Sequence, residues 1–312
     1  MKYSLCTLSD YNYLSFGLAL YDSLMEHTSE EFDLHYLAMD DETEAKLIDL
    51  NLKNVIVHSL REFECDDKYI ELKNKNEKNP ESDLGHSPFH YMMSSFFSDY
   101  LLNKKNLPHI FYIDSDIYFY GNFASVYNSV KDHSIGLVTH KHIQLDKTTR
   151  NPGYYNVGVV YFNRDDVGKG CLRFWKECCV NPDNEYSEIF GACGDQKYLE
   201  LFGDKFGEDN IQNICLKVGN GAPWNFHMFD YLENNKILWK DPNGIVIRGG
   251  GFLEQDLMFV HFSHFTPDYE SLSYRMDWSG EWGPWIRQIP GVQKLYWNYF
   301  DRLLLTREKY EL

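Results

Sequence analysis

The sequence lacks the positive charge that binding to nucleic acid or to an anionic membrane surface requires. Its 312 residues contain 30 lysines and arginines against 47 aspartates and glutamates, which gives a formal net charge of −17. Phosphate backbones and acidic lipids attract proteins of the opposite sign. We therefore expect no nucleic-acid partner. A protein this negative needs a local cation to hold an anionic ligand such as a diphosphate, and a divalent metal ion is one way to supply it.

Paired cysteines and long hydrophobic runs are missing as well. The seven cysteines include no C-x-x-C pair, and the adjacent Cys178 and Cys179 cannot easily pair with each other, which is typical of reduced thiols in a reducing compartment. No window of about 18 apolar residues occurs, so no transmembrane segment is predicted. Polar residues interrupt every apolar stretch of the first 24 residues, unlike a secretory signal. We expect a soluble, cytoplasmic protein.

Internal repeats and low-complexity tracts are also absent, and what remains is an alternation of strand and helix patterns. Up to residue 58 the chain reads strand, helix, strand, helix, strand, which is typical of a parallel sheet covered by helices. The predicted strands cover residues 3–8, 32–39, 54–58, 109–113, 117–120, 135–139, 154–163 and 258–262. The predicted helices cover residues 14–25, 42–50, 88–102, 123–130, 167–179, 195–201 and 282–311. The polar residues 61–86 predict a long surface loop.

The simplest organisation is one α/β domain over residues 1–265, with a helical C-terminal extension over residues 266–312 packed on it. Aromatic residues make up 16% of the chain. The aromatic stripe through Trp297, Tyr299 and Phe300 more often packs on a core than binds a ligand.

An acidic pair follows a fully apolar strand. Residues 110–116 read IFYIDSD, so the strand ends in Asp114 and Asp116. Ionised carboxylates are costly inside a sheet, and the ligand crevices of open α/β sheets lie at the carboxyl ends of the strands. Two such carboxylates suit Mn²⁺ or Mg²⁺, which can neutralise a pyrophosphate. A solvated turn or a helix cap is the alternative interpretation.

Two histidines follow the late apolar strand, in the segment VHFSHF at residues 260–265. One imidazole beside two carboxylates would leave the remaining positions around a cation to diphosphate oxygens. The residues themselves do not distinguish His261 from His264. A hydrogen-bonded core histidine is the alternative for either one.

The segment YYNVGV at residues 154–159 carries polar groups suited to a sugar. Asn156 offers both a hydrogen-bond donor and an acceptor, and Gly158 allows a ligand to approach the backbone. Further along, Asp195 in the segment GDQ either caps a helix or places a carboxylate near a reacting carbon. Trp224 in the segment GAPWN either stacks on a sugar face or anchors its loop.

Taken together and in this order, these segments resemble the GT-A superfamily of nucleotide-sugar glycosyltransferases. The family-8 type, which includes glycogenin and bacterial lipopolysaccharide galactosyltransferases, is the most similar. The resemblance spans residues 3–265 and rests on an ordered set of motifs: Y-x-D-x-D-x-Y-F, Y-N-V-G, D-Q-K-Y-L and A-P-W-N. It implies a GT-A type Rossmann-like fold, with a mixed, mainly parallel sheet flanked by helices.

The resemblance also implies roles for individual residues. Asp114, Asp116 and His261 would bind Mn²⁺ or Mg²⁺, and Asp195 and Gln196 would form the pair beside the anomeric carbon in retaining members. Tyr13 would stack on uracil, which favours a UDP-sugar donor. The nucleotide would further contact Thr7, Leu8, Ser9, Asp10 and Ser115, and the donor sugar or acceptor would contact Asn156, Gly158, Trp224 and Asn225.

The implied reaction is the metal-dependent transfer of a hexose-type sugar from a nucleotide-diphosphate donor to a saccharide or glycoconjugate acceptor, with retention. A protein with this activity would be peripheral to a membrane wherever its acceptor lies there. The sequence departs from the family pattern after His261, because the expected glycine is His264 and the diphosphate-binding lysine is missing. Arg248, Arg275 and Arg287 are the candidates to replace that lysine.

Three rival interpretations remain. A sugar-1-phosphate nucleotidyltransferase would need a glycine-rich, basic loop after the first strand, where residues 9–12 read SDYN. A phosphohydrolase with an aspartate nucleophile would carry its acidic pair nearer the N-terminus. A non-catalytic protein that binds carbohydrate or nucleotide sugar on a transferase scaffold is compatible with the missing lysine.

Overall fold

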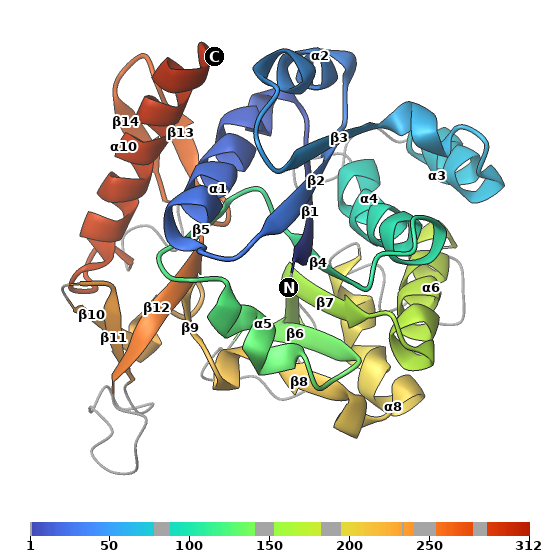
Figure 1. Cartoon of the computed structure of the whole chain (residues 1–312). Coiled ribbons are helices and arrows are strands. Elements are labelled where there is room, and N and C mark those ends of the chain that lie inside the picture. Colours follow the sequence, from blue (N-terminus) through green and yellow to red (C-terminus); the bar gives the residue numbers. More distant parts are fainter. Residues whose placement is uncertain are drawn as a thin grey trace.

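The computed structural model of the chain describes residues 2–77, 88–140, 153–181, 195–232, 234–239, 254–276 and 286–312. Its centre is a seven-stranded sheet flanked by helices (Figure 1). In spatial order the strands are β3 (Val55–Ser59), β2 (Phe32–Ala38), β1 (Tyr3–Ser9), β4 (His109–Ile113), β7 (Tyr155–Asn163), β6 (Ile135–Thr139) and β8 (Ile211–Asn213). Only β7 runs antiparallel to its neighbours, so the sheet is mixed and mainly parallel, as predicted.

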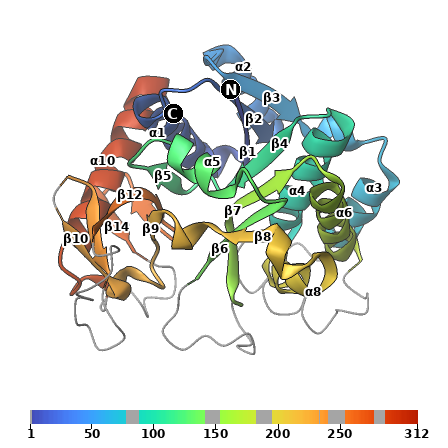
Figure 2. The same ribbon diagram turned by 60° about the horizontal axis from the view of Figure 1, so that its bottom comes forward.

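Helices cover both faces of this sheet. The described α-helices of the chain are α1 (Leu14–His27), α2 (Asp41–Leu50), α3 (Asp67–Glu77), α4 (Pro88–Asp99), α5 (Ala124–Val130), α6 (Asp166–Val180), α8 (Phe202–Phe206) and α10 (Val292–Tyr310). Figures 1 and 2 show α4 and α6 on one side and α1 on the other. Alternate residues of β1 belong to the two cores: Cys6 packs with α4 and α6, whereas Leu5 packs with α1 and α5. Alternation therefore places an apolar side chain on each face.

A second, smaller sheet has five strands. It joins β10 (Phe229–Leu232), β11 (Lys236–Trp239), β12 (Glu254–His261) and β5 (Ile117–Phe119), and β9 (Gly219–Gly221) pairs with β12. A separate hairpin joins β13 (Thr266–Asp268) and β14 (Ser273–Arg275). Of these strands, the sequence predicted only β5 and the apolar part of β12. The others are three or four residues long, which is too short for a periodic pattern to register.

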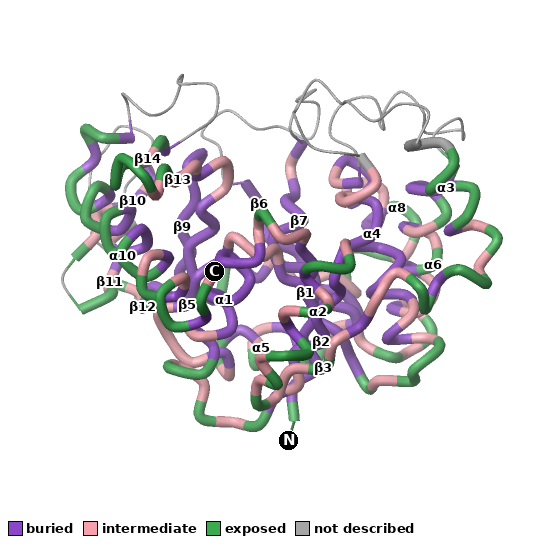
Figure 3. Tube along the Cα trace, turned by 90° about the horizontal axis from the view of Figure 1, so that it is seen from above, coloured by how far each residue is buried: buried purple, intermediate pink, exposed green. Residues whose placement is uncertain are grey.

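The helix α10 packs against α1 and the small sheet through a third apolar cluster. The rings of Tyr299 and Phe262 stack with centroids 3.8 Å apart and planes at 6°. Tyr299 and Phe300 are buried, as the predicted aromatic stripe requires, whereas Trp297 is about half exposed. Figure 3 shows the same division, with buried residues along the strands and exposed ones on the outer sides of the helices.

Two expectations about local structure are wrong. The predicted loop 61–86 contains α3 and the short 3₁₀ turn Leu60–Phe63, because Tyr69 and Leu72 bury one face of an otherwise polar helix; residues 78–87 lie outside the described chain. The predicted helix 282–311 is not continuous: α10 covers only its part from Val292, since Gly291 has a φ of 80° that a right-handed helix cannot adopt, and residues 282–285 lie outside the described chain. Within the described residues, no helix is both long and apolar enough to cross a bilayer.

The packing of α10 gives a prediction about stability. Replacing Tyr299 with alanine removes a fully buried ring, so we expect the free energy of unfolding to fall by about 3 kcal/mol or more. The control Leu305→Ala removes a side chain of the same helix that is 57% exposed, and should change that free energy by less than about 1 kcal/mol. Urea denaturation of both variants measures this. Equal effects would show that α10 does not pack as described.

Candidate active site

Asp114, Asp116 and His261 come together at the junction of the two sheets. Asp114 follows β4, Asp116 precedes β5, and His261 is the last residue of β12. The antiparallel pairing of β12 with β5 places His261 opposite Ile117, next to the acidic turn. The backbone amide of Phe262 donates to the carbonyl of Asp116 at 2.9 Å and holds the two segments in register.

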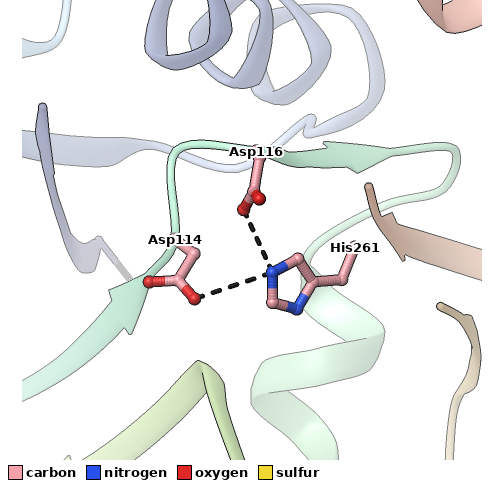
Figure 4. Close-up of side chains that lie close together, drawn as sticks. All are labelled: Asp114, Asp116 and His261. Atoms are coloured by element: carbon pink, nitrogen blue, oxygen red, sulfur yellow. Dashed lines mark ion pairs between the residues drawn. The ribbon is translucent and has the colours of Figure 1, made fainter. Parts of the chain in front are cut away.

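The three side chains converge on one point (Figure 4). The Nε2 atom of His261 lies 3.1 Å from Oδ1 of Asp116 and 3.7 Å from Oδ2 of Asp114. One ligand atom from each residue lies within 4.8 Å of the other two. Two carboxylate oxygens and one imidazole nitrogen form a donor set that Mn²⁺ accepts.

The other ring nitrogen of His261 is fixed by Asn156. Its Nδ1 atom lies 3.1 Å from Oδ1 of Asn156, and an amide oxygen accepts hydrogen bonds but cannot donate them. Nδ1 therefore carries the proton, and Nε2 is directed at the carboxylates, which is the arrangement that metal-binding histidines use. The positions of Asp114, Asp116 and His261 are therefore compatible with binding of a divalent cation.

Asn156 also connects His261 to the second predicted group. Its Nδ2 atom donates to Oε1 of Gln196 at 2.9 Å, and its Oδ1 atom accepts from the amide of Gly158 at 2.8 Å. An amide side chain can make four hydrogen bonds, and His261, Gly158 and Gln196 account for three of those of Asn156. The predicted ligand His261 and the predicted reaction-centre residue Gln196 share a single positioning residue.

Gly158 makes room for the imidazole. A Cβ atom at this position would lie 2.6 Å from Nδ1 of His261 and 2.6 Å from Oδ1 of Asn156, distances that side chains cannot tolerate. The group that approaches the Gly158 backbone in the structure is thus His261. Contact with a donor sugar at this position stays a prediction.

Trp224 and Asn225 support the site from behind. The indole of Trp224 meets the His261 ring edge-on, with centroids 5.3 Å apart, and is buried. Asn225 is fully buried; its Oδ1 atom accepts from the amide of Ala222 at 2.9 Å and its Nδ2 atom donates to the carbonyl of His140 at 3.3 Å. In the structure this amide holds its own loop, and contact of either residue with a sugar stays a prediction.

Asp195 lies in a buried position on the α4 side of the site. Its Oδ2 atom accepts from the hydroxyl of Ser94 at 2.7 Å, and its carbonyl accepts from the indole of Trp175 at 3.0 Å. It precedes the 3₁₀ helix Gln196–Leu201, which continues into α8, and its side chain makes no capping hydrogen bond. Helix capping therefore does not explain this carboxylate. Ser94 was missed from the sequence because nothing marks which face of a predicted helix turns toward a site.

Electrostatics favour positive charge between the carboxylates. Burial raises the pKa of Asp114 to about 6, with the charge of Asp116 adding to the rise and His261 opposing it. Burial also raises the pKa of Asp116, but His261 and then His264 outweigh it, so that pKa lies below its usual range. Burial lowers the pKa of His261, but Asp116 and Asp114 raise it by more, so that this pKa lies above its ordinary value. A bound cation would relieve the same repulsion.

Most of the predicted nucleotide-binding segment along β1 is buried. Thr7 and Leu8 belong to the interior, and the hydroxyl of Ser9 hydrogen-bonds to that of Tyr36 at 2.7 Å. The roles of these three residues toward a nucleotide stay predictions. Their backbone lies at the carboxyl end of β1, which is the position at which such sheets bind ligands.

Asp10, Tyr13 and Ser115 lie at the surface of the site. Asp10 accepts from the amide of Tyr13 at 3.1 Å, and the Tyr13 ring stacks on Phe16 at 5.0 Å. Burial raises the pKa of the Tyr13 hydroxyl, and the charges of Asp116 and Asp10 raise it further. Ser115 is partly exposed between the two aspartates. The roles of all three toward a nucleotide stay predictions.

None of the arginines that the structure describes pairs with the acidic turn, and the candidates to replace the missing lysine stay predictions. Arg275 and Arg287 are exposed, and Arg248 lies outside the described residues. In the described ranges, the ion pairs of Asp114 and Asp116 are with His261, and no lysine or arginine pairs with either of them. In the described chain, the basic side chain that contacts this acidic turn is the imidazole of His261.

Comparison with known proteins agrees with this arrangement. Residues 5–170, more than half of the 312, match the sequence family described as glycosyl transferase family 8. The uncharacterized protein YfnF of Bacillus subtilis (strain 168) is 28% identical over 274 residues, covering 85% of this chain and 82% of that protein.

Two solved structures share the fold. The galactosyltransferase LgtC, crystallised with donor and acceptor sugar analogues, is similar with a TM-score of 0.53 at 13% identity, over 96% of this chain and 94% of that one. Mouse xyloside xylosyltransferase 1 gives a TM-score of 0.50 at 16% identity, over 84% and 98% of the two chains. The protein described here therefore belongs to glycosyl transferase family 8 and is a glycosyltransferase of the GT-A fold.

Proposed function

We propose that this enzyme transfers a hexose from a UDP-sugar to a saccharide or glycoconjugate acceptor, that it requires Mn²⁺ or Mg²⁺, and that it retains the configuration of the anomeric carbon. The observation that carries the proposal is the convergence of Asp114, Asp116 and His261 within one hydrogen-bonded network with Gln196. Of the similar proteins, the solved galactosyltransferase was crystallised with donor and acceptor sugar analogues, which supports a sugar donor and a sugar acceptor here.

In this proposal, Asp114, Asp116 and His261 hold the divalent cation. When bound, such an ion supplies positive charge to the donor diphosphate and to the nucleoside diphosphate that leaves. Asn156 keeps the proton on Nδ1 of His261, so that Nε2 presents its lone pair. Gly158 and Trp224 hold the imidazole plane against β7. These contacts restrict the ligand to one orientation before substrate arrives.

The remaining residues place the donor. Tyr13 would stack on the uracil, beside Asp10 and Ser115, while Gln196 and Asn156 would face the sugar. Asp195 would lie near the anomeric carbon, where it would position the donor sugar or, in its ionised form, steady positive charge. Gln196 follows Asp195 in the chain and accepts a hydrogen bond from Asn156, the residue that orients His261. The Asp195 carboxylate itself is held by Ser94, and its chain neighbour Gln196 belongs to the network of the metal ligand.

We also propose that the reaction takes place in a reducing compartment such as the cytoplasm. The described cysteines, at positions 6, 65, 171, 178, 179 and 215, are all unpaired, which supports that assignment. An acceptor in a membrane would make the enzyme peripheral to it.

The metal assignment predicts the effect of Asp116→Asn. This change keeps the shape of the side chain but removes a charge, so we expect Mn²⁺-dependent hydrolysis and transfer from UDP-sugars to fall by at least about 100-fold. The control Asp204→Asn removes an exposed charge from α8 and should leave both rates unchanged. Release of UDP from a panel of UDP-sugars, with and without Mn²⁺, measures them. Full activity of Asp116→Asn would remove the metal assignment.

The close approach of His261 to β7 predicts the effect of Gly158→Ala. The added Cβ would displace His261 or Asn156, so we expect the affinity for Mn²⁺ to fall by about 10-fold or more. The control Gly170→Ala adds a Cβ whose nearest contact is 3.6 Å away, on Phe206. Isothermal titration with Mn²⁺ compares the two variants with the unmodified enzyme. Equal affinities for all three would show that His261 is not a ligand.

The burial of Asp195 predicts a pH-dependent stability. Burial raises the pKa of Asp195 from 3.8 to about 8, with the charge of Asp114 adding to the rise and Ser94 opposing it. Because the folded pKa is the higher one, the protonated carboxyl favours the fold below pH 4, and this contribution is lost as pH rises through 8.

Asp195→Asn removes this dependence. Its free energy of unfolding relative to the unmodified protein should rise by about 2 kcal/mol between pH 6 and pH 8 without metal. Denaturation at several pH values measures the difference, and Asp204→Asn should give a curve parallel to that of the unmodified protein. A parallel curve for Asp195→Asn as well would show that Asp195 ionises normally in the fold.

A further inference from the structure

A cavity of about 390 Å³ lies between the end of α1, the strand β5 and the helix α10. Figure 1 shows these three elements beside one another. From α10 the cavity is lined by Asn298, Asp301, Arg302 and Leu305, whose spacing of three and four residues places them along one face of the helix. Sites for small ligands have volumes of about 300–1,000 Å³, so this cavity has room for such a ligand.

The cavity is separate from the candidate active site. None of its described lining residues belongs to that site. The chain runs from Asp116 through β5 to Tyr120, and at about 3.3 Å per residue these two residues lie roughly 13 Å apart. The amide of Tyr120 donates to the carbonyl of Met258 at 2.8 Å, which continues the pairing of β5 with β12. A ligand in the cavity therefore leaves the metal site free.

Tyr118 and Tyr120 form an aromatic wall of the cavity. Their ring centroids are 5.1 Å apart, with the ring planes at 58°. Tyr120 is partly exposed, whereas Tyr118 is 3% exposed and its hydroxyl has no hydrogen-bond partner among the described residues. Buried hydroxyls mostly have a partner in the protein or in ordered water, so the unpaired one on this wall favours a polar occupant of the cavity.

The charged groups of the cavity argue against an anionic ligand. The guanidinium of Arg302 is already paired with Glu26, another lining residue, through contacts of 3.0 Å from Nη1 to Oε2 and 3.3 Å from Nη2 to Oε1. Asp301 is exposed and forms no ion pair with the described residues. An anion would therefore meet two carboxylates and a guanidinium whose charge is compensated.

The remaining polar groups suit a neutral polyol. The carboxylate of Asp301 accepts hydrogen bonds, and the amide of Asn298, three residues before it on the same face of α10, both donates and accepts them. A sugar carries hydroxyls that do both, and its ring has apolar C–H faces that pack against aromatic side chains. Two tyrosine rings on one wall and two polar side chains on another match these two properties.

We propose that this cavity binds a neutral sugar residue of the saccharide acceptor, away from the reaction centre. The inference rests on the proposed function, because a saccharide acceptor is what supplies a second sugar unit. The apolar face of the sugar packs against Tyr120, and its hydroxyls bind Asp301 and Asn298. An acceptor held here by one unit presents its reacting end to the metal site at a higher effective concentration than one in free solution.

The test measures the binding of galactose, glucose, N-acetylglucosamine, lactose and maltose by saturation-transfer NMR, with and without UDP and Mn²⁺. We expect at least one of these sugars to bind with the same Kd under both conditions, because the cavity shares no residue with the metal site. Its Kd should rise by about 10-fold or more in Asp301→Ala, as for loss of a hydrogen bond to a charged group. Tyr120→Ala should have a similar effect through loss of the ring. Since Asp301 is exposed and unpaired in the described chain, Asp301→Ala keeps the fold and decides the test if Tyr120→Ala unfolds.

Glu308→Ala is the matched control, because it removes an exposed carboxylate of the same helix that does not line the cavity. It should leave the Kd unchanged. Absence of binding by all five sugars, binding of the cation choline in their place, or a sugar Kd unaffected by Asp301→Ala would overturn the inference, as would a sugar that UDP and Mn²⁺ displace. Failure of the unmodified enzyme to bind any UDP-sugar with Mn²⁺ would instead overturn the proposed function. The sugar titrations without nucleotide do not depend on that result, so the two failures are distinguishable.

Discussion

The antiparallel pairing of β12 with β5 is the contact on which the rest of the site depends. It is a short pairing of three residues on each side, from Phe259 to His261 and from Ile117 to Phe119. Within it, His261 lies next to the acidic turn that ends the central sheet. A shift of one residue would point the imidazole to the opposite face of the small sheet. The register is held by the main-chain bond from Phe262 to Asp116 and by the apolar side chains of β12.

A second constraint comes from β7, the one strand of the central sheet that runs against its neighbours. Its direction brings Asn156 and Gly158 to the edge where β4 ends, and the amide of Asp114 donates to the carbonyl of Gly158 at 2.9 Å. The same two residues then accommodate and orient His261 from the side. The end of β4, the start of β7 and the end of β12 therefore meet at the site, and the backbone positions of these strands restrict the orientation of each side chain there.

Much of this could be predicted from the sequence, for identifiable physical reasons. The long strands and helices carry clear periodic patterns, and β4 and β6 were predicted with their observed bounds. Asp114 and Asp116 could be predicted as a pair because charged residues directly after an apolar strand must emerge at its end. His261 entered only through resemblance to the family, since the residues alone left it equal to His264.

The rest depends on contacts between distant residues, which carry no local signal. The link from His261 through Asn156 to Gln196 joins three segments, and the residues along it have ordinary local patterns. The same holds for Ser94, which is an unremarkable helix residue until Asp195 is placed against it. Apart from β5, the short strands of the second sheet were missed because three or four residues form a strand only when a partner is present.

The position of α10 has a consequence for the order in which this enzyme matures. The ring of Tyr299 covers Phe262, the residue immediately after His261, and α10 follows every element that contributes a side chain to the site. During synthesis on the ribosome, the strand that carries His261 is complete before the helix that buries its back has emerged. The nascent chain therefore holds both carboxylates and the imidazole while the aromatic support behind them is still missing. Competence to bind metal should appear late in translation, when α10 leaves the exit tunnel.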